Sequence, residues 1–216
     1  MSFSPGTLIS FLIALSFAAG LNLYATVATL GILGRTGWVD LPSTLSMLSS
    51  SWIIYPSIIL FLVEVFADRI PFVGLAWNVG QLFIRAPLAA LMAYQAATHL
   101  SPGMQFAVAV MGGIIATVAH SSKTVTRMIA AEGGIPVPSI AMNGSGDVVA
   151  IALAWLASEH PIISGFTVVA VLVLMVFLVR HAYRAMRHEF TTLHRRCTDW
   201  WAKHRRRHAH LPLKIE

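Results

Sequence analysis

The sequence predicts an all-α membrane protein, a polytopic bundle of about six transmembrane helices. Its 216 residues are 56% hydrophobic and only 11% charged, whereas soluble domains carry about 25% charged residues. The mean hydropathy is +0.72, and a helix needs about 20 mainly apolar residues to cross the hydrocarbon core of a bilayer. The length of the chain therefore accommodates about six such helices and their connections.

Charge divides the chain into two predicted regions. Residues 1–179 hold five basic and six acidic residues, a balance of −1, and residues 180–216 hold ten basic and three acidic residues, a balance of +7. The formal net charge of +6 therefore comes from the C-terminal end. We predict a transmembrane helical domain over residues 1–180 and a basic amphipathic cytoplasmic tail over residues 181–216.

The first predicted transmembrane helix covers residues 7–33 and has a polar interruption, Gly20-Leu-Asn22-Leu-Tyr24. The Asn22 amide needs a hydrogen-bond partner inside a membrane, either across a helix interface or in a water-filled cavity. Residues 35–51 are too polar to cross a bilayer. Their apolar side chains recur every three or four residues, which predicts a short interfacial or re-entrant helix.

The second and third predicted helices each carry a polar face. The helix at residues 51–71 is apolar until it places Glu64 and Asp68 four residues apart, so both carboxylates lie on one face. The helix at residues 72–99 carries a polar stripe at helical spacing. This stripe consists of Asn78, Gln81 and Arg85.

The fourth predicted helix covers about residues 104–120 and continues beyond its apolar run. Gly112 and Gly113 in its middle permit close contact with another helix. The helical pattern then extends along one face through His120, Lys123 and Arg127. A loop at residues 132–138 follows, because glycine and proline break the pattern there.

The fifth predicted helix, residues 139–158, opens with Asn143-Gly-Ser-Gly-Asp147, which is too flexible for a good helix start in water. The sixth, residues 162–180, has no ionisable or amide side chain in its interior. Three helices per half would give the two halves opposite membrane orientations. Short blocks of similar sequence in the two halves are compatible with such a 3+3 inverted repeat.

The placement of lysine and arginine predicts the orientation. If the basic tail is cytoplasmic, an even number of helices puts the N-terminus in the cytoplasm too. The cytoplasmic connections then hold Arg69, Lys123 and Arg127, and the opposite side holds Arg35, which agrees with the positive-inside rule. We expect a multi-pass protein with both termini in the cytoplasm.

The tail has the pattern of a basic amphipathic helix over residues 183–201, with apolar residues at alternating intervals of three and four. We expect it to bind the anionic lipid surface. Pairing with a second copy in a homodimer and docking under the helix bundle are the alternatives. Nucleic-acid binding is not expected, because membrane topology and binding to anionic lipid already account for the positive charge of the tail. The predicted lipid-binding residues are Arg184, Arg187, Arg195, Arg196, Trp200 and Trp201.

Polar side chains on several predicted helices form the candidate site, a pathway for a small polar solute or ion. A lone charge at the centre of a bilayer costs about 2.5–17 kcal/mol, so these groups must pair or be hydrated. Pairing of Glu64 or Asp68 with Arg85 or Lys123 across helices would meet that need. The full set is Asn22, Glu64, Asp68, Asn78, Gln81, Arg85, His120, Lys123, Arg127, Asn143 and Asp147.

Other interpretations of these residues stay open. In the first, the residues form a network that only fixes helix register. In the second, Glu64, Asp68 and Asp147 make an oxygen-ligand divalent metal site. In the third, His120 relays protons. For catalysis, the sequence lacks the G-x-S-x-G and H-E-x-x-H motifs and has no cysteine within the predicted transmembrane helices. We therefore do not expect an enzyme, and we predict no cofactor.

Three blocks of residues also suggest a family. Gly20-Leu-Asn22 followed by Tyr24-Ala-Thr, Leu-Val-Glu64-Val-Phe-Ala-Asp68-Arg-Ile-Pro, and His120-x-x-Lys123-x-x-x-Arg127 resemble the bacterial membrane proteins described as domain of unknown function 4126. The resemblance covers about residues 6–180 and leaves the tail outside. It implies a polytopic protein of the bacterial inner membrane and supplies no activity.

The leading functional hypothesis from the sequence is a small transporter or channel-like permease with a charged intramembrane cavity. A non-transporting membrane scaffold or accessory subunit, whose buried polar network is structural, is the second. An intramembrane enzyme that acts on a lipid is the third. A wetted cavity reaching Glu64 and Asp147 is expected of a transporter, and mutual pairing without solvent is expected of a scaffold.

Overall fold

The computed structural model describes residues 5–68, 70–132, 139–177 and 180, and every regular element in these ranges is a helix. The predicted all-α class is therefore confirmed. The predicted loop at residues 132–138 lies almost wholly outside the described residues, and the predicted tail lies entirely outside them. Lipid binding by the tail and the inverted repeat stay predictions.

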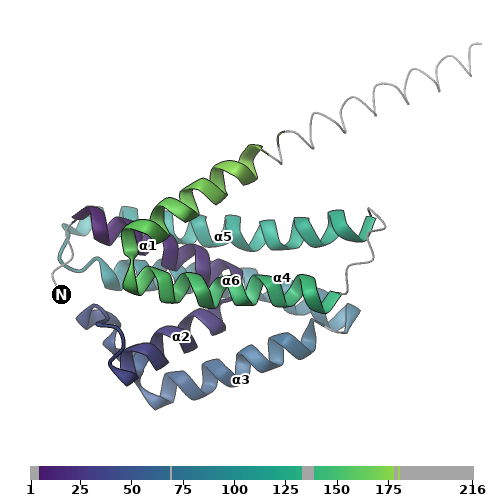
Figure 1. Cartoon of the computed structure of the whole chain (residues 1–216), viewed down its shortest axis with the longest axis horizontal. Coiled ribbons are helices and arrows are strands. Elements are labelled where there is room, and N and C mark those ends of the chain that lie inside the picture. The colour runs from purple at the N-terminus through teal and green to yellow at the C-terminus, as the bar shows by residue number, and fades with distance from the viewer. Residues whose placement is uncertain (1–4, 69, 133–138, 178–179, 181–216) are drawn as a thin grey trace, which may run out of the picture. The chain divides into compact units, whose positions relative to one another are not determined.

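The chain divides into two compact units, residues 1–170 and 171–216, and helices α1 to α6 all belong to the first. The helices, in chain order, are α1 (Pro5–Leu21), α2 (Leu23–Thr36), the 3₁₀ helix η1 (Ser43–Ser49), α3 (Ser51–Ala67), α4 (Pro71–Ala96), α5 (Pro102–Glu132) and α6 (Ser139–Glu159) (Figure 1). A last helical stretch, Pro161–Phe177, begins in the first unit.

Helix α1 is the centre of the packing. Its sequence is apolar on all sides, which is typical of a helix that is enclosed rather than amphipathic. It contacts α4, α5 and α6, and side chains such as Phe11 and Leu15 are fully buried. At Gly20 the backbones come very close, because a methyl group there would lie 2.6 Å from the Ala116 Cα on α5.

The first predicted helix is divided in two at its polar interruption. Asn22 leaves the helical conformation, with φ −153° and ψ 103°, and its side-chain oxygen accepts a hydrogen bond from the Ala25 backbone N–H at 2.9 Å. Asparagine is a favoured N-cap because it satisfies a free amide of the first turn in this way. The stretch at residues 7–33 therefore forms α1 and α2 instead of one continuous helix.

The predicted short helix within residues 35–51 is confirmed as η1. It follows a turn in which Gly37 adopts a left-handed conformation, with φ 72°. An angle of 63° separates η1 from α3, whose first turn is capped by the Ser50 hydroxyl. Helix α2 packs against both η1 and α3, so these three helices form one side of the unit.

Helices α4 and α5 pack closely because small residues meet between them. A methyl group at Gly112 would lie 2.9 Å from the Ala93 Cβ, and one at Gly113 would lie 3.3 Å from the Ala86 carbonyl oxygen. This confirms the close contact predicted for the two glycines. The continuation of α5 through Lys123 is also confirmed, since the helix ends at Glu132.

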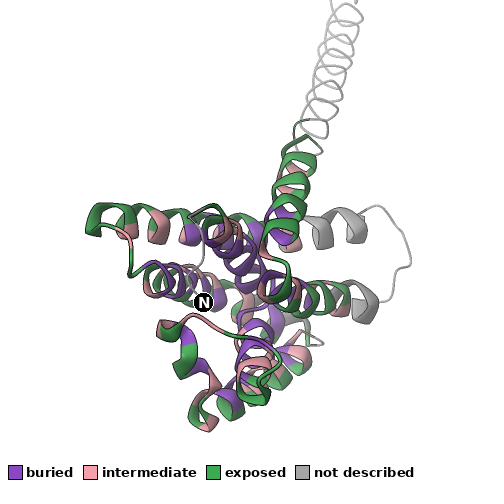
Figure 2. Ribbon diagram, turned by 60° about the vertical axis from the view of Figure 1, so that its left-hand side comes forward, coloured by how far each residue is buried: buried purple, intermediate pink, exposed green. Residues whose placement is uncertain are grey.

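Buried residues lie on the helix faces that meet inside this unit (Figure 2). Charged side chains are among them, and many large apolar side chains are exposed. Arg85 is 1% exposed and Glu64 is 2% exposed, whereas Trp52 on α3 is 89% exposed and Phe83 on α4 is 74% exposed. Charged side chains are almost never fully buried unless they are paired, so Arg85 and Glu64 require partners inside the unit.

Length and composition identify fewer membrane-crossing helices than the sequence predicts. Among the described residues, the helical stretch Pro102–Lys123 is long and apolar enough to cross a bilayer, and η1 with α3 would make a second such element if the bent pair is one span. Gly6–Leu21 and Pro161–Phe177 are apolar but shorter. A bundle of six transmembrane helices is therefore not confirmed and stays a prediction.

Candidate functional site

The candidate site is built around the break between α1 and α2. Because the Ala25 amide bonds to the Asn22 side chain, it no longer bonds to the Leu21 carbonyl one turn earlier. The Gly20 and Leu21 carbonyl oxygens at the end of α1 instead accept hydrogen bonds from Arg85 Nη1, at 3.2 and 2.8 Å. A cation at the C-terminal end of a helix also complements the helix dipole.

Arg85 on α4 connects this break to two further helices. Its Nη2 donates to Glu64 Oε1 on α3, and its Nε donates to Gln81 Oε1 at 3.2 Å. Its Nη1 also lies 3.3 Å from His120 Nδ1 on α5. A guanidinium can only donate, so a hydrogen bond in this contact requires the His120 tautomer in which Nδ1 is the acceptor.

Lys123 on α5 forms the second half of the cluster. Its Nζ lies 2.9 Å from Asp147 Oδ1 on α6, 3.5 Å from the Leu21 carbonyl oxygen and 3.9 Å from Glu64 Oε1. Asp147 Oδ1 also accepts a hydrogen bond from Asn22 Nδ2 at 2.9 Å. The side chain of Lys123 lies against Gly146, where a methyl group would be 3.0 Å from its Cε.

The charges in this cluster balance. Glu64 and Asp147 carry two negative charges and Arg85 and Lys123 carry two positive charges, with Glu64 Oε1 shared between the two cations. Each buried ion costs several kcal/mol to remove from water, and good pairing with further hydrogen bonds offsets that cost. The cluster therefore joins helices α3, α4, α5 and α6 to the break between α1 and α2.

One polar atom in this cluster is left over. Glu64 Oε2 is buried and has no hydrogen-bond partner among the described residues. A buried carboxylate oxygen without a partner carries a desolvation cost of about 1–3 kcal/mol or more. A water molecule, a proton or a ligand group at Oε2 would remove that cost.

The structure brings most of the predicted residues together and separates or omits a few. Asp68 caps the end of α3 and accepts a hydrogen bond from Asn78 Nδ2 at 3.1 Å. Arg127 lies in α5 and Asn143 lies in α6, but their side chains are outside the described part of the chain. The tail residues Arg184, Arg187, Arg195, Arg196, Trp200 and Trp201 lie outside it as well. The cluster consists of buried Asn22, Glu64, Gln81, Arg85, His120 and Asp147, together with Lys123, whose side chain is 7% exposed.

The helix predicted over residues 139–158 is present as α6, and its opening stretch Asn143–Asp147 is helical although its composition disfavours a helix start in water. The divalent metal site that the sequence left open for Glu64, Asp68 and Asp147 gains no support, because the described residues contain no group of three or more potential histidine, cysteine or acidic ligands. Arg85 and Lys123 occupy the positions beside the carboxylates that a metal ion would need.

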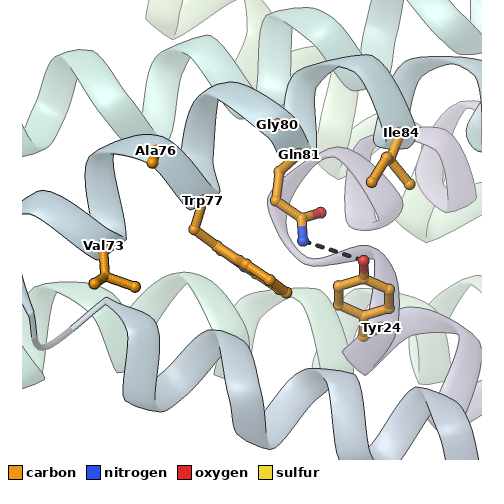
Figure 3. Close-up of a pocket in the computed structure, with 7 residues that line it drawn as sticks. All are labelled: Tyr24, Val73, Ala76, Trp77, Gly80, Gln81 and Ile84. Carbon is orange, nitrogen blue, oxygen red and sulfur yellow. Dashed lines mark hydrogen bonds between the residues drawn. The ribbon is translucent and has the colours of Figure 1, made fainter.

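A pocket of about 550 Å³ adjoins the cluster (Figure 3). Gln81 connects the two, because its Oε1 accepts from Arg85 and its Nε2 donates to the Tyr24 hydroxyl oxygen at 3.1 Å. Neither Glu64 nor Asp147 lines the pocket, so the pocket stops short of the charges. The lining residues are Tyr24, Val73, Ala76, Trp77, Gly80, Gln81 and Ile84.

Sequence reasoning placed Gln81 in the site but missed the pocket residues around it. Trp77 stands four residues before Gln81 and shares its helix face, so helical spacing was a signal that could have identified it. Tyr24 follows the interruption at Asn22, but its side chain meets α4 only because α2 begins in a new turn. The roles of the Gly20 and Leu21 carbonyls also follow from that break.

Comparison with known proteins identifies a family and no individual relative. The family described as Domain of unknown function (DUF4126) matches residues 9–181, which is well over half of the chain. No curated protein and no solved structure matches the sequence. The family description supplies no activity, so the function must be argued from the site.

Proposed function

The chain belongs to the family described as Domain of unknown function (DUF4126), and we propose that it is an integral membrane permease whose buried charge cluster controls a pathway for a small polar solute or ion. The observation that carries the proposal is Glu64. Its Oε1 is bound by Arg85 and its Oε2 is buried without a partner among the described residues. A carboxylate half satisfied in this way has one oxygen available for a passing ligand.

The distribution of polarity supports a place in the membrane. Large apolar side chains are exposed on α3, α4, α5 and the last helix, including Trp52, Phe83, Phe106 and Phe166. A bilayer would solvate these side chains, and the paired charges would face the protein interior as ionisable residues in membranes do. In this proposal about six helices cross the bilayer. Both termini are cytoplasmic, and the membrane is the bacterial inner membrane.

The broken helix supports a transport role within that membrane. Secondary transporters place their sites where discontinuous helices leave carbonyl oxygens and helix ends free to bind charge. Here the carbonyls of Gly20 and Leu21 are bound by side-chain cations instead of a free ion. The arrangement therefore corresponds to a closed state, in which Arg85 and Lys123 would have to move before a solute could pass.

One observation favours a second function, a non-transporting scaffold or accessory subunit. The charges pair with one another, and the pocket does not reach Glu64 or Asp147. A network that only holds helices in register would have these features. The scaffold requires no movement of Arg85, whereas the permease requires it.

Reconstitution into lipid vesicles separates the two functions. We expect the wild-type protein to raise the permeability of vesicles to protons or to a small polar solute, measured with an entrapped pH dye and by osmotic swelling. Glu64→Gln should change that rate at least tenfold. Glu159→Gln is the matched control, because Glu159 is exposed at the end of α6, and it should leave the rate unchanged.

The scaffold predicts a different pattern in the same assay. Wild-type vesicles would then be no more permeable than protein-free vesicles, and Glu64→Gln would only lower the thermal stability of the protein. That result would overturn the permease proposal.

A further inference from the structure

We propose that the pocket beside α4 binds a small uncharged amphipathic molecule, with its apolar part against Trp77 and Ile84 and a hydrogen-bond-accepting oxygen at the Tyr24 hydroxyl. This inference goes beyond the proposed permease function, because it requires equilibrium binding and no flux. It would hold for a scaffold as well.

The pocket has the size and lining of a small-molecule site. Its volume of about 550 Å³ lies within the range of about 300–1,000 Å³ that is typical of ligand pockets. One wall is a single face of α4, formed by Val73, Trp77 and Ile84 at helical spacing. Tyr24 and Gln81 lie together beside this wall, and their hydroxyl and amide supply polar groups (Figure 3).

Gly80 keeps the wall of the pocket open. It stands inside α4, where glycine lowers helix stability relative to alanine. No neighbouring atom explains the glycine, because a methyl group at this position would meet nothing within 4 Å. Gly20 and Gly112, in contrast, are close to other helices. The space above Gly80 is therefore available to a bound molecule.

The Tyr24 hydroxyl provides a donor for that molecule. Among the described residues it makes one hydrogen bond, in which its oxygen accepts from Gln81 Nε2. The hydroxyl proton is then free to point to an oxygen in the pocket. Tyr24 is itself 8% exposed, so its ring is held in place and does not rotate into solvent.

The charge of the ligand follows from what lines the pocket. No charged side chain is among the lining residues, and Arg85 lies behind Gln81 with 1% exposure. An ionised group placed among Trp77, Ile84 and Val73 would lose its hydration without gaining a counter-ion. An alcohol, ether, ester or amide oxygen fits the Tyr24 donor without that loss.

Photolabelling of the full-length protein in lipid vesicles tests this site. The probe is an aryl trifluoromethyl-diazirine that carries a benzyl alcohol group, and the comparison probe is the same aryl diazirine without the hydroxyl. We expect the alcohol probe to label the pocket face of α4, between Val73 and Ile84, and to saturate. An excess of benzyl alcohol should prevent the labelling.

Two variants assign the labelling to the pocket. Tyr24→Phe should raise the concentration of alcohol probe needed for half-saturation about tenfold, the effect of one hydrogen bond, and leave the other probe unchanged. Gly80→Leu should abolish saturable labelling by both probes. Gly144→Leu is the matched control, because Gly144 is also a helix glycine with open space around it and lies outside the pocket.

Bulk partitioning into lipid gives the opposite result. Labelling would then rise in proportion to probe concentration, would be equal for the two probes and would be unaffected by Tyr24→Phe. That outcome would overturn the proposal even if Gly80→Leu failed to fold, because Tyr24→Phe removes only a hydroxyl group.

Discussion

The buried charge cluster and the open pocket lie along the same face of α4, yet they differ in how completely they are filled. Trp77, Gln81 and Arg85 follow one another at intervals of four residues, so one stripe of the helix runs through both regions. Around Arg85, groups from α1, α3 and α5 approach within hydrogen-bond distance. Apart from α4 itself, the pocket around Trp77 is lined by Tyr24 of α2.

The difference shows that the number of converging helices determines whether a polar stripe becomes a closed network or an open site. Where several helices converge, the Nε, Nη1 and Nη2 atoms of Arg85 each donate to at least one partner, and the side chain is buried. Where one helix approaches, a space of about 550 Å³ is left. Gln81 stands at the boundary and bonds to both sides.

The largest effect is expected from Arg85→Met. This change leaves Glu64 as a buried charge without its main partner, removes the Arg85 donor from the Gly20 carbonyl and leaves the Leu21 carbonyl with only the Lys123 Nζ at 3.5 Å. We expect the free energy of unfolding to fall by about 3–5 kcal/mol, measured by denaturant unfolding in micelles followed by circular dichroism. The double variant Arg85→Met, Glu64→Leu should recover more than half of the loss. A single-variant loss under about 1 kcal/mol would mean that the cluster is hydrated and not closed.

Asn22→Ala should have the next largest effect. It removes both the cap of α2 and the donor to Asp147, at a cost of about 1–3 kcal/mol in the free energy of unfolding. Asn22→Asp keeps a capping oxygen but places a second carboxylate beside Asp147. We expect this variant to be at least as unstable as Asn22→Ala. If capping alone mattered, Asn22→Asp would be as stable as the wild type.

A comparison of two glycines in α6 tests how tightly Lys123 is held. A methyl group at Gly146 would lie 3.0–3.5 Å from the end of the Lys123 side chain, whereas one at Gly144 would meet nothing within 4 Å. Gly144→Ala should raise stability by about 0.5–1 kcal/mol through helix propensity. Gly146→Ala should be about 1–2 kcal/mol less stable than Gly144→Ala, because Lys123 must move away from Asp147. Equal thermal unfolding temperatures for the two variants would show that Lys123 adjusts freely.

The smallest effect is expected in the pocket. Gly80→Ala places a methyl group in open space within α4 and should raise the free energy of unfolding by about 0.5–1 kcal/mol. A higher free energy of unfolding for Gly80→Ala, together with a lower one for Arg85→Met, would show the difference between the open pocket and the closed cluster by the same kind of measurement. A loss of stability at Gly80 would show instead that the space above it is occupied within the folded protein.

The sequence allowed several parts of the site to be predicted because they depend on local spacing. The four-residue spacing in the Gln81–Arg85 stripe and the extension of α5 through Lys123 follow from helical periodicity. The need for a partner at Asn22 follows from an amide placed among apolar residues. Charge alone predicted pairing of Glu64 or Asp68 with Arg85 or Lys123, and the structure selects Glu64 as the partner of Arg85.

Local propensity was not decisive for Asn143–Asp147, the flexible opening of the predicted fifth helix. Two glycines and a serine disfavour a helix in water, yet this stretch is helical in α6. Gly146 lies against Lys123, and Asp147 bonds to Asn22 from a distant part of the chain. Tertiary contacts of this kind outweigh the small cost of helix-interior glycines.

The sequence by itself determined the helical class and which side chains share a helix face, since both follow from the repeat of one helix. Tertiary structure alone decided that Arg85 binds the Gly20 and Leu21 carbonyls, that Lys123 joins Asp147 and that Tyr24 and Gln81 border an open pocket. The physical reason is that helical periodicity is a property of neighbouring residues, whereas the partner of a buried polar group depends on which helices pack together. Those helices are far apart along the chain, and no local pattern records how they meet.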